Sequence, residues 1–302
     1  MNKLLKRLLV VLGAVLLIAA AVILTGWLQA GKRQERHIDV RAEVLAVALP
    51  TEAAAIERGR YLFNSRGCAE CHGADGAGHK VIDGGGMLVI SPHISPGPGS
   101  VTASYRVEDW VRAIRHGVKP DGRPLLIMPS EDYNRLTDAD VGALVAYAKQ
   151  LPAVPKGETA VIQFPPPVRV LYGLGLIQDS AAKIDHSLPP AAPVPEGPTV
   201  EHGRYVAQMC MGCHGPGYSG GKIPGGPPDW PAAANLTPGG GSVMERYASV
   251  DAFIAMMKSG KRPSGEAIPV MPFPSLSQMN EVDLRGLHAF LKTLPAKEFG
   301  NR

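Results

Sequence analysis

Two short cysteine motifs constrain this chain more than any other feature. The stretch CAECHG begins at Cys68 and CMGCHG begins at Cys210, and each places two thiols three residues apart with a histidine directly after the second. All four cysteines of the 302-residue sequence lie in these motifs. None remains for a disulfide elsewhere in the chain or for a separate nucleophile.

Cys-x-x-Cys pairs serve several chemistries. A thioredoxin-like redox site is expected near a βαβ pattern, and no Val/Ile-rich strands alternate with helices in this sequence. A zinc ribbon places its two pairs about 15 to 20 residues apart, whereas Cys71 and Cys210 are separated by a domain's length. Zinc, thiol redox and a local disulfide all leave the histidine of both motifs unexplained.

Covalent haem attachment explains both the cysteines and the histidine. Each thiol forms a thioether to the porphyrin, and the adjacent imidazole reaches the iron from the same helical turn. The sequence therefore predicts two covalently bound haem c groups. The expected thioether positions are Cys68, Cys71, Cys210 and Cys213, and the expected proximal iron ligands are His72 and His214.

The segments around the two motifs repeat. IERGRYLFNSRGCAECHG from Ile56 matches VEHGRYVAQMCMGCHG from Val200, and HISPGPGSV from His93 matches NLTPGGGSV from Asn235. The offset stays between 142 and 144 residues. Each copy reads as a helix, the motif, a glycine- and proline-rich loop, a second helix, a Met-Pro loop and a last helix. We therefore predict an all-α fold with two tandem domains that arose by duplication.

The repeat also selects two of the ten methionines. Met128 lies 56 residues after His72, Met271 lies 57 after His214, and each is followed by proline. We predict that these two thioethers complete the iron coordination. A six-coordinate His/Met iron passes single electrons and leaves no position for a substrate, so no catalytic residue is predicted. The methionines without a counterpart are interpreted as core residues: Met87, Met209, Met211, Met244, Met256, Met257 and Met279.

The N-terminal segment indicates a membrane helix. Leu8 to Trp27 is apolar and carries no charge, and at about 1.5 Å of rise per residue it spans a hydrocarbon core of about 30 Å. A cleaved signal peptide is the alternative, but its apolar region usually has about 7 to 15 residues and is followed by an A-x-A site. We predict an uncleaved anchor, with residues 1–7 in the cytoplasm, 8–28 in the membrane and 29–50 as a linker.

Charge and composition describe the rest of the chain. Residues 1–40 carry six Lys/Arg and two Asp/Glu, which equals the net charge of +4, so the remainder is balanced and nucleic acid is not a predicted partner. Residues 153–198 include FPPPV and LPPAAPVPEGP. They predict a semi-rigid proline-rich connector, with a short helix expected within Val168 to Lys183.

Residues 51–300 resemble class I type dihaem cytochromes c, and in particular the cytochrome subunits of membrane-bound alcohol, aldehyde and gluconate dehydrogenases. The resemblance is carried by both CxxCHG motifs, by NLTP from Asn235, by GVKPDGRPLLIMP from Gly117 and by VMPFPSLSQMNEVDLRGLHAFL from Val270. It implies cytochrome c domains at 51–152 and 199–302. It also implies that Gly59 packs against Tyr147, and Gly203 against Phe290. Many of these subunits carry three haems, whereas this sequence has two motifs and an N-terminal anchor.

The function expected from these features is single-electron transfer by a single-pass protein of the bacterial inner membrane, with both haem domains in the periplasm. Electrons are expected to come from a periplasmic dehydrogenase and to pass to quinone or a terminal oxidase. A cytochrome subunit of a haem-copper oxidase is the alternative. A dihaem peroxidase or a haem sensor needs an open or displaceable iron ligand, and some thiosulfate-oxidising cytochromes need a fifth cysteine, so these have less support.

Overall fold

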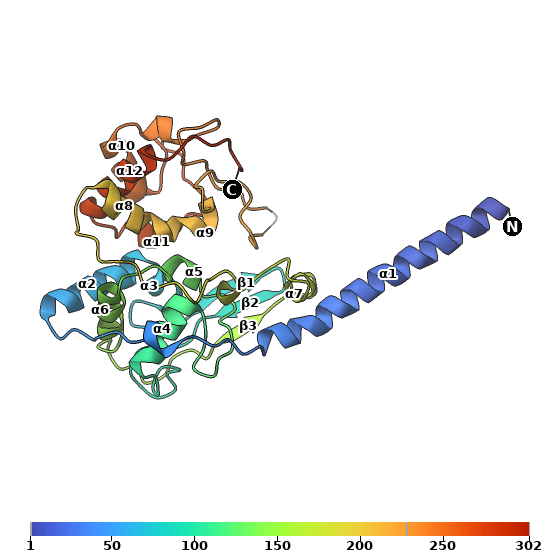
Figure 1. The fold of residues 1–302 in the computed structure, drawn as a ribbon, viewed down its shortest axis with the longest axis horizontal. Coiled ribbons are helices and arrows are strands. Elements are labelled where there is room, and N and C mark those ends of the chain that lie inside the picture. Colours follow the sequence, from blue (N-terminus) through green and yellow to red (C-terminus); the bar gives the residue numbers. More distant parts are fainter. Residues whose placement is uncertain (1, 228, 302) are drawn as a thin grey trace.

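The computed structural model describes residues 2–227 and 229–301. A body of helices carries one long helix, α1 (Lys3–Gln34), that projects away from it (Figure 1). Among the described residues, α1 is the one helix long and apolar enough to cross a membrane. Its composition and its place near the N-terminus fit both a membrane anchor and a signal sequence.

The body has two groups of helices that follow the sequence repeat (Figure 1). We call residues 51–152 the first half and residues 199–301 the second half. The helices of the first half are α2 (Ala53–Ser65), α3 (Cys68–His72), α4 (Val107–His116), α5 (Ser130–Tyr133) and α6 (Asp138–Ala148). Those of the second half are α8 (Val200–Val206), α9 (Met211–His214), α10 (Val250–Ser259), α11 (Phe273–Leu276) and α12 (Glu281–Lys292), with 3-10 turns η3 (Ala207–Cys210) and η4 (Met244–Tyr247).

The two halves share their backbone hydrogen bonds as well as their helix order. The amide of Val101 donates to the carbonyl of His93, and that of Val243 donates to Asn235, both at 3.0 Å. The last helices begin with equivalent side-chain caps: the Thr137 hydroxyl accepts from an amide of α6 at 3.1 Å, and the side-chain oxygen of Asn280 accepts from one of α12 at 2.8 Å. These backbone bonds and helix caps therefore recur at aligned positions of the sequence repeat.

The first and last helix of each half cross at a glycine. A Cβ placed on Gly59 of α2 would lie 2.0 Å from the carbonyl oxygen of Ala143 and 2.8 Å from the Cβ of Tyr147 in α6. A Cβ on Gly203 of α8 would lie 1.8 Å from the oxygen of Gly286 in α12, and 2.9 Å from the Cβ of Phe290. The predicted glycine–aromatic contacts are confirmed in both halves.

A small antiparallel sheet departs from the all-α prediction. Its strand order is β1-β2-β3, with β1 (Lys80–Gly84), β2 (Met87–Ile90) and β3 (Val161–Gln163). Gly85 and Gly86 both have positive φ and close the two-residue turn between the first two strands, as a type I′ hairpin requires. The sequence VIDGGGMLVI carries this hairpin signal, but it falls in the segment that the sequence analysis predicts to be a glycine- and proline-rich loop.

The connector is folded onto the body, and it contains the expected short helix. It supplies β3, then α7 (Pro166–Gly173) and the 3-10 turn η2 (Ser180–Ala182). Helix α7 packs against the end of α1 so closely that a Cβ on Gly173 would lie 1.7 Å from the carbonyl oxygen of Gly26. Just beyond α1, Arg36 forms two hydrogen bonds of 2.7 and 2.6 Å with the buried carboxylate of Asp179. The connector thus joins the N-terminal helix to the first half.

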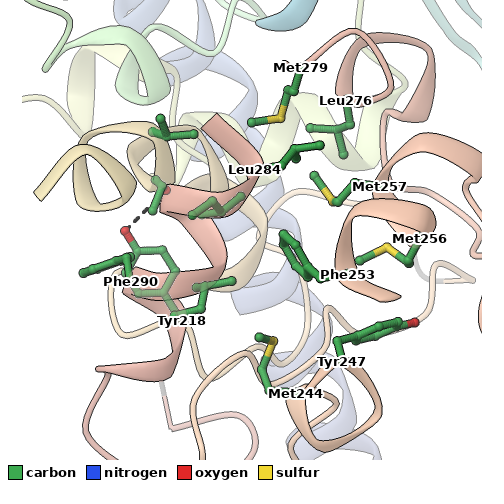
Figure 2. Close-up of a cluster of buried hydrophobic side chains, with 14 residues drawn as sticks. Tyr218, Met244, Tyr247, Phe253, Met256, Met257, Leu276, Met279, Leu284 and Phe290 are labelled. Carbon is green, nitrogen blue, oxygen red and sulfur yellow. Dashed lines mark hydrogen bonds between the residues drawn. The ribbon is translucent and has the colours of Figure 1, made fainter. Parts of the chain in front are cut away.

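Each half has its own apolar core. Figure 2 shows the core of the second half, where four methionines lie among aromatic and leucine side chains. All four are buried, in agreement with their interpretation as core residues. They are Met244, Met256, Met257 and Met279.

The glycine crossings generate a stability prediction. Gly203→Ala forces a methyl group into the α12 backbone and is expected to lower the free energy of unfolding by about 1 to 3 kcal/mol, as overpacking does. The same change at Gly84, where a Cβ meets nothing within 4 Å, is the matched control and should change it little. Denaturant unfolding followed by circular dichroism measures both. Equal stability of the two variants would contradict the close packing of α8 on α12.

Candidate haem sites

Each cysteine motif forms a short helical turn that gathers its functional side chains. In the first half, α3 contains both thiols and the histidine, and it lies between two glycines with positive φ, Gly67 and Gly73. In the second half, the motif runs from the end of η3 through α9 to Gly215, which also has positive φ. Residues three and four apart in a helix share a face. Each turn therefore presents two sulfurs and one imidazole together.

The two motif histidines have equivalent hydrogen-bond partners. Nδ1 of His72 lies 3.0 Å from the carbonyl oxygen of Pro92, and Nδ1 of His214 lies 2.8 Å from that of Ala234. Each carbonyl is 20 residues after its histidine. Donation from Nδ1–H leaves the Nε2 lone pair available to a metal and fixes the ring orientation. Burial lowers the pKa of His72, which favours the neutral, ligating form.

These two carbonyls were not identified from the sequence. The sequence repeat does align the two residues, because Pro92 and Ala234 directly precede the aligned segments that begin at His93 and Asn235. A carbonyl acceptor, however, carries no side-chain signature. Only the folded loop shows that it faces the imidazole.

The environment of the thiols does not suit thiol redox chemistry. Burial raises the pKa of Cys68 and of Cys210 to about 12, whereas reactive cysteines have lowered values. Within residues 2–227 and 229–301, no three His, Cys, Asp or Glu side chains converge as a metal cluster.

An apolar cavity of about 360 Å³ lies beside the first motif. Cys68, Cys71 and His72 line it, and so does Met128 from the Met-Pro loop. Most of the remaining lining is aliphatic or aromatic, as an apolar macrocycle requires. Two sulfurs for thioether bonds, a histidine and a methionine thus share one apolar cavity, so these residues fit a covalently bound haem.

The connector and the sheet complete this cavity. Val81 of β1 and Val89 of β2 contribute to the lining, together with Ala160 and Ile162 from the connector. The backbone carbonyl of Met128 accepts a hydrogen bond of 2.5 Å from the hydroxyl of Ser180, also in the connector. The sequence predicts only a semi-rigid proline-rich connector with a short helix, and it does not indicate that the connector lines this cavity.

The second motif has a related environment. Cys210 and Met271 both pack against the buried cluster of the second half, which Figure 2 shows. The Met-Pro loops are built alike, since the Ser130 amide donates to the Met128 carbonyl at 2.9 Å and the Phe273 amide donates to the Met271 carbonyl at 2.8 Å. The structure thus places a Met-Pro turn with the same backbone hydrogen bond in each half, although Val270, directly before Met271, has a positive φ that Ile127 does not share.

The other histidines are engaged within the protein. Four are buried, and His116 lies 3.1 Å from His186 of the connector, Nδ1 to Nδ1. Burial lowers the pKa of His116 to about 4, so this ring is neutral at physiological pH. These contacts are made within the folded chain. The buried histidines outside the two motifs are His93, His116, His202 and His288.

A buried ion pair lies beside the first motif. Arg66, two residues before Cys68, forms a 2.6 Å pair with Asp283 at the start of α12, and both are buried. The Asp283 carboxylate also accepts a bond of 2.6 Å from Tyr61 and lies 2.7 Å from Nε2 of His202. Burial by itself raises the pKa of Asp283, but Arg66 and these hydrogen bonds outweigh it and lower the pKa to about 2. The pair therefore stays ionised over a wide pH range.

With this geometry described, comparison with known families identifies the first half. Residues 54–147 match the family described as cytochrome c oxidase, cbb3-type, subunit III. The chain therefore contains a cytochrome c domain, a class that binds haem c covalently and transfers electrons.

The relatives of the whole chain are cytochromes as well. The fructose dehydrogenase cytochrome subunit of Gluconobacter japonicus is 30% identical over 274 residues, which cover 82% of this chain and 55% of the relative. The cytochrome c subunit of the quinone-dependent alcohol dehydrogenase of Gluconobacter oxydans is 27% identical over 285 residues, covering 83% and 57%. A dihaem c-type cytochrome of Cereibacter sphaeroides is 28% identical over 273 residues, covering 80% and 86%. The chain spans about half the length of the first two relatives.

The ion pair predicts a pH-dependent stability. The ordinary pKa of an aspartate is 3.8 and that of folded Asp283 is about 2, so its ionisation stabilises the fold fully above about pH 4, and this stability is lost as pH falls toward 2. The loss amounts to about 2 kcal/mol. Denaturant unfolding between pH 2 and 5 measures it.

Asp283→Asn should remove this pH-dependent component. It should also destabilise the protein at pH 7 by about 3 to 5 kcal/mol, because it leaves the buried guanidinium of Arg66 without a charged partner. Asp251→Asn changes an exposed carboxylate and is the control. An unaltered pH profile in Asp283→Asn would contradict the assignment.

Proposed function

We propose that the chain carries two haem c groups, one in each half. The first is bound by Cys68 and Cys71, with His72 and Met128 on the iron. The second is bound in the same way by Cys210, Cys213, His214 and Met271. The observation that carries this proposal is the matched pair of histidine Nδ1–carbonyl hydrogen bonds, each 20 residues along the chain. When bound, each haem supplies an iron that changes charge by one electron, and the protein holds its ligands in place.

We propose further that α1 is retained as a membrane anchor. Its C-terminal turns are packed into the body, since Ala30 is fully buried and α7 crosses α1 at Gly26. Arg33 donates a hydrogen bond of 3.0 Å to the carbonyl of Gly173, and Arg36 pairs with Asp179. Cleavage of α1 within this region would expose the packed surface of α7. These contacts support the retention of α1, and the location we propose is the bacterial inner membrane, with a single span and both halves in the periplasm.

The proposed role is electron transfer from a periplasmic dehydrogenase toward quinone or a terminal oxidase. Its support is the similarity to subunits named for fructose and alcohol dehydrogenases over more than four fifths of this chain. A His/Met iron has a raised reduction potential and no open coordination site, and both properties suit an acceptor of single electrons. The substrate of the partner dehydrogenase would determine where the electrons come from.

A second candidate role is the cytochrome subunit of a haem-copper oxidase. The family that matches residues 54–147 is described as such a subunit and supports this candidate. In this role the same two sites would pass electrons into the oxidase. The direction of flow and the partner differ, whereas the chemistry at the two irons does not.

The ligand assignment predicts separate effects of two substitutions. Met128→Ala should lower the reduction potential of one haem by on the order of 0.1 V and let carbon monoxide bind its iron, because the thioether that raises the potential is lost. Met271→Ala should do the same to the other haem. Potentiometric titration and the spectrum of the reduced protein with carbon monoxide measure these effects.

Met279→Leu, in the buried core of the second half, is the control and should leave both potentials unchanged. If both alanine variants keep the wild-type potentials and exclude carbon monoxide, the two methionines are not ligands. A single titrating haem in the wild type would contradict the two-haem proposal.

Mild detergent extraction of native membranes tests the physiological role. We expect a flavin-, quinone-cofactor- or molybdenum-dependent dehydrogenase to co-purify, and its alcohol, aldehyde or sugar substrate to reduce the haems. A chain with Cys210→Ala and Cys213→Ala keeps α1 but should bind one haem, and is the control for electron passage through both sites. Co-purification of copper and b-type haem, with reduction by quinol-side donors alone, would support the oxidase role instead.

A further inference from the structure

The two halves are joined by a pair of crossed hydrogen bonds. The hydroxyl of Tyr61 in α2 donates to Asp283 of the second half at 2.6 Å. The hydroxyl of Tyr205 in α8 donates to Asp140 of the first half at 2.5 Å. Both tyrosines close a Gly-Arg-Tyr sequence in the repeat, and both aspartates lie in the first turn of the last helix. Equivalent residues therefore make equivalent contacts in opposite directions.

The backbone completes this arrangement. The Tyr61 oxygen accepts a hydrogen bond of 3.1 Å from the amide of Asn280, and the Tyr205 oxygen accepts one of 3.2 Å from the amide of Thr137. Asn280 and Thr137 are the N-cap residues of the two last helices. Each tyrosine thus binds the start of the other half's last helix through its side chain and its backbone. Reciprocal contacts of this kind are the mark of a two-fold interface. We call them the crossed tyrosine joint.

Cations hold both aspartates of the joint. Arg58 forms two hydrogen bonds with Asp140, of 2.9 and 3.0 Å, from within the first half. Arg66 pairs with Asp283 across the interface. Each carboxylate therefore accepts from a guanidinium and from a tyrosine at once. Breaking either tyrosine contact leaves a partly buried carboxylate with an unfilled acceptor position.

The joint brings the two cysteine motifs to the interface. The amide of Gly212, inside CMGCHG, donates a hydrogen bond of 3.1 Å to Asp132 in α5 of the first half. The hydroxyl of Ser275, in α11, donates one of 2.6 Å to Glu70 inside CAECHG. Helices α5 and α11 each follow the Met-Pro loop of their own half. Every motif therefore contacts the segment that follows the candidate axial methionine of the other half.

We propose that the crossed tyrosine joint holds the two haem groups in a fixed relative position, so that electrons pass directly between them within one chain. Tyr61 and Tyr205 are its positioning residues. This inference rests on the proposed two-haem function and adds to it the residues that fix the separation of the two sites. One electron leaves one iron and reduces the other, so no proton or further reactant is required.

The connector alone does not supply this constraint. Residues 190–199 between the halves have no helix or strand, and a proline-rich tether limits distance without fixing orientation. Domains joined only by a tether move relative to each other. The buried contacts of the joint restrict that motion, together with the motif contacts at Gly212 and Glu70.

The experiment compares full-length, detergent-solubilised holoprotein with the Tyr61→Phe/Tyr205→Phe double variant. One haem is reduced by a light pulse, and the rate at which the electron equilibrates between the two is followed by absorbance. We expect this rate to fall at least about tenfold, because each of the two lost hydrogen bonds to a charged group lowers the ratio of docked to undocked halves by about tenfold or more. The reduction potentials of the two haems should remain unchanged. The absorption that depends on the bond between each methionine sulfur and its iron should also remain unchanged.

Tyr172→Phe is the matched control, because Tyr172 also donates to a buried aspartate, Asp179, at 2.8 Å, but at the junction of α1 and the connector. Its equilibration rate should equal that of the wild type. The single variants Tyr61→Phe and Tyr205→Phe each keep one crossed contact, so their rates should lie between those of the wild type and the double variant. If the double variant does not accumulate, the single variants provide the test.

Two results would overturn the proposal, and they differ from each other. A wild-type protein with two haems whose double variant equilibrates at the wild-type rate would refute the joint alone. A wild-type protein with one haem would refute the proposed function and the joint together. Haem content, measured on the same samples, separates these outcomes.

Discussion

The close crossing of the first and last helix at a glycine is the contact on which each half depends. In the first half, α2 leads directly into the motif helix α3, and α6 follows the loop that carries Met128. When Gly59 lets α2 lie against the backbone of α6, the positions of the motif and of the Met-Pro loop are set together. The same relation holds at Gly203 in the second half. A single small residue in each half thus controls the position of the cysteine motif relative to the Met-Pro loop.

The two halves share this pair of crossed helices but differ in the segments that pack around them. The first half gains a sheet and the connector, which contribute Ile162 to the cavity and a hydroxyl to the carbonyl of Met128. Within the described residues of the second half, no strand accompanies the motif, and methionines fill much of the core. Burial and solvent access tune the potential of a haem. The asymmetry therefore gives a duplicated chain a means to make its two sites unequal.

Local patterns predicted much of this molecule. The spacing of Cys68, Cys71 and His72 lies in a short segment, and the position of Met128 follows from the repeat, so both are visible in the sequence. The glycine–aromatic pairs were expected from the family resemblance. Two kinds of contact were not visible in the sequence. The carbonyl of Pro92 has no side-chain signature, and the pairing of Tyr61 with Asp283 joins residues more than 200 positions apart. The Pro92 contact follows from how one loop folds within the first half, and the Tyr61–Asp283 contact from how the two halves dock. Periodicity and composition encode neither.

The packing of α7 on α1 has a mechanical consequence. Helix α1 continues without interruption from the apolar segment to Gln34, and its end is held by Gly173 and by the pairing of Arg36 with Asp179. In a bilayer, a membrane helix adjusts its tilt to the hydrocarbon thickness. If α1 is retained in the membrane as proposed, a change in its tilt turns the first half relative to the membrane plane, because the end of α1 is fixed to the body. Lipid composition would then set the angle at which the protein presents itself to a partner in the same membrane.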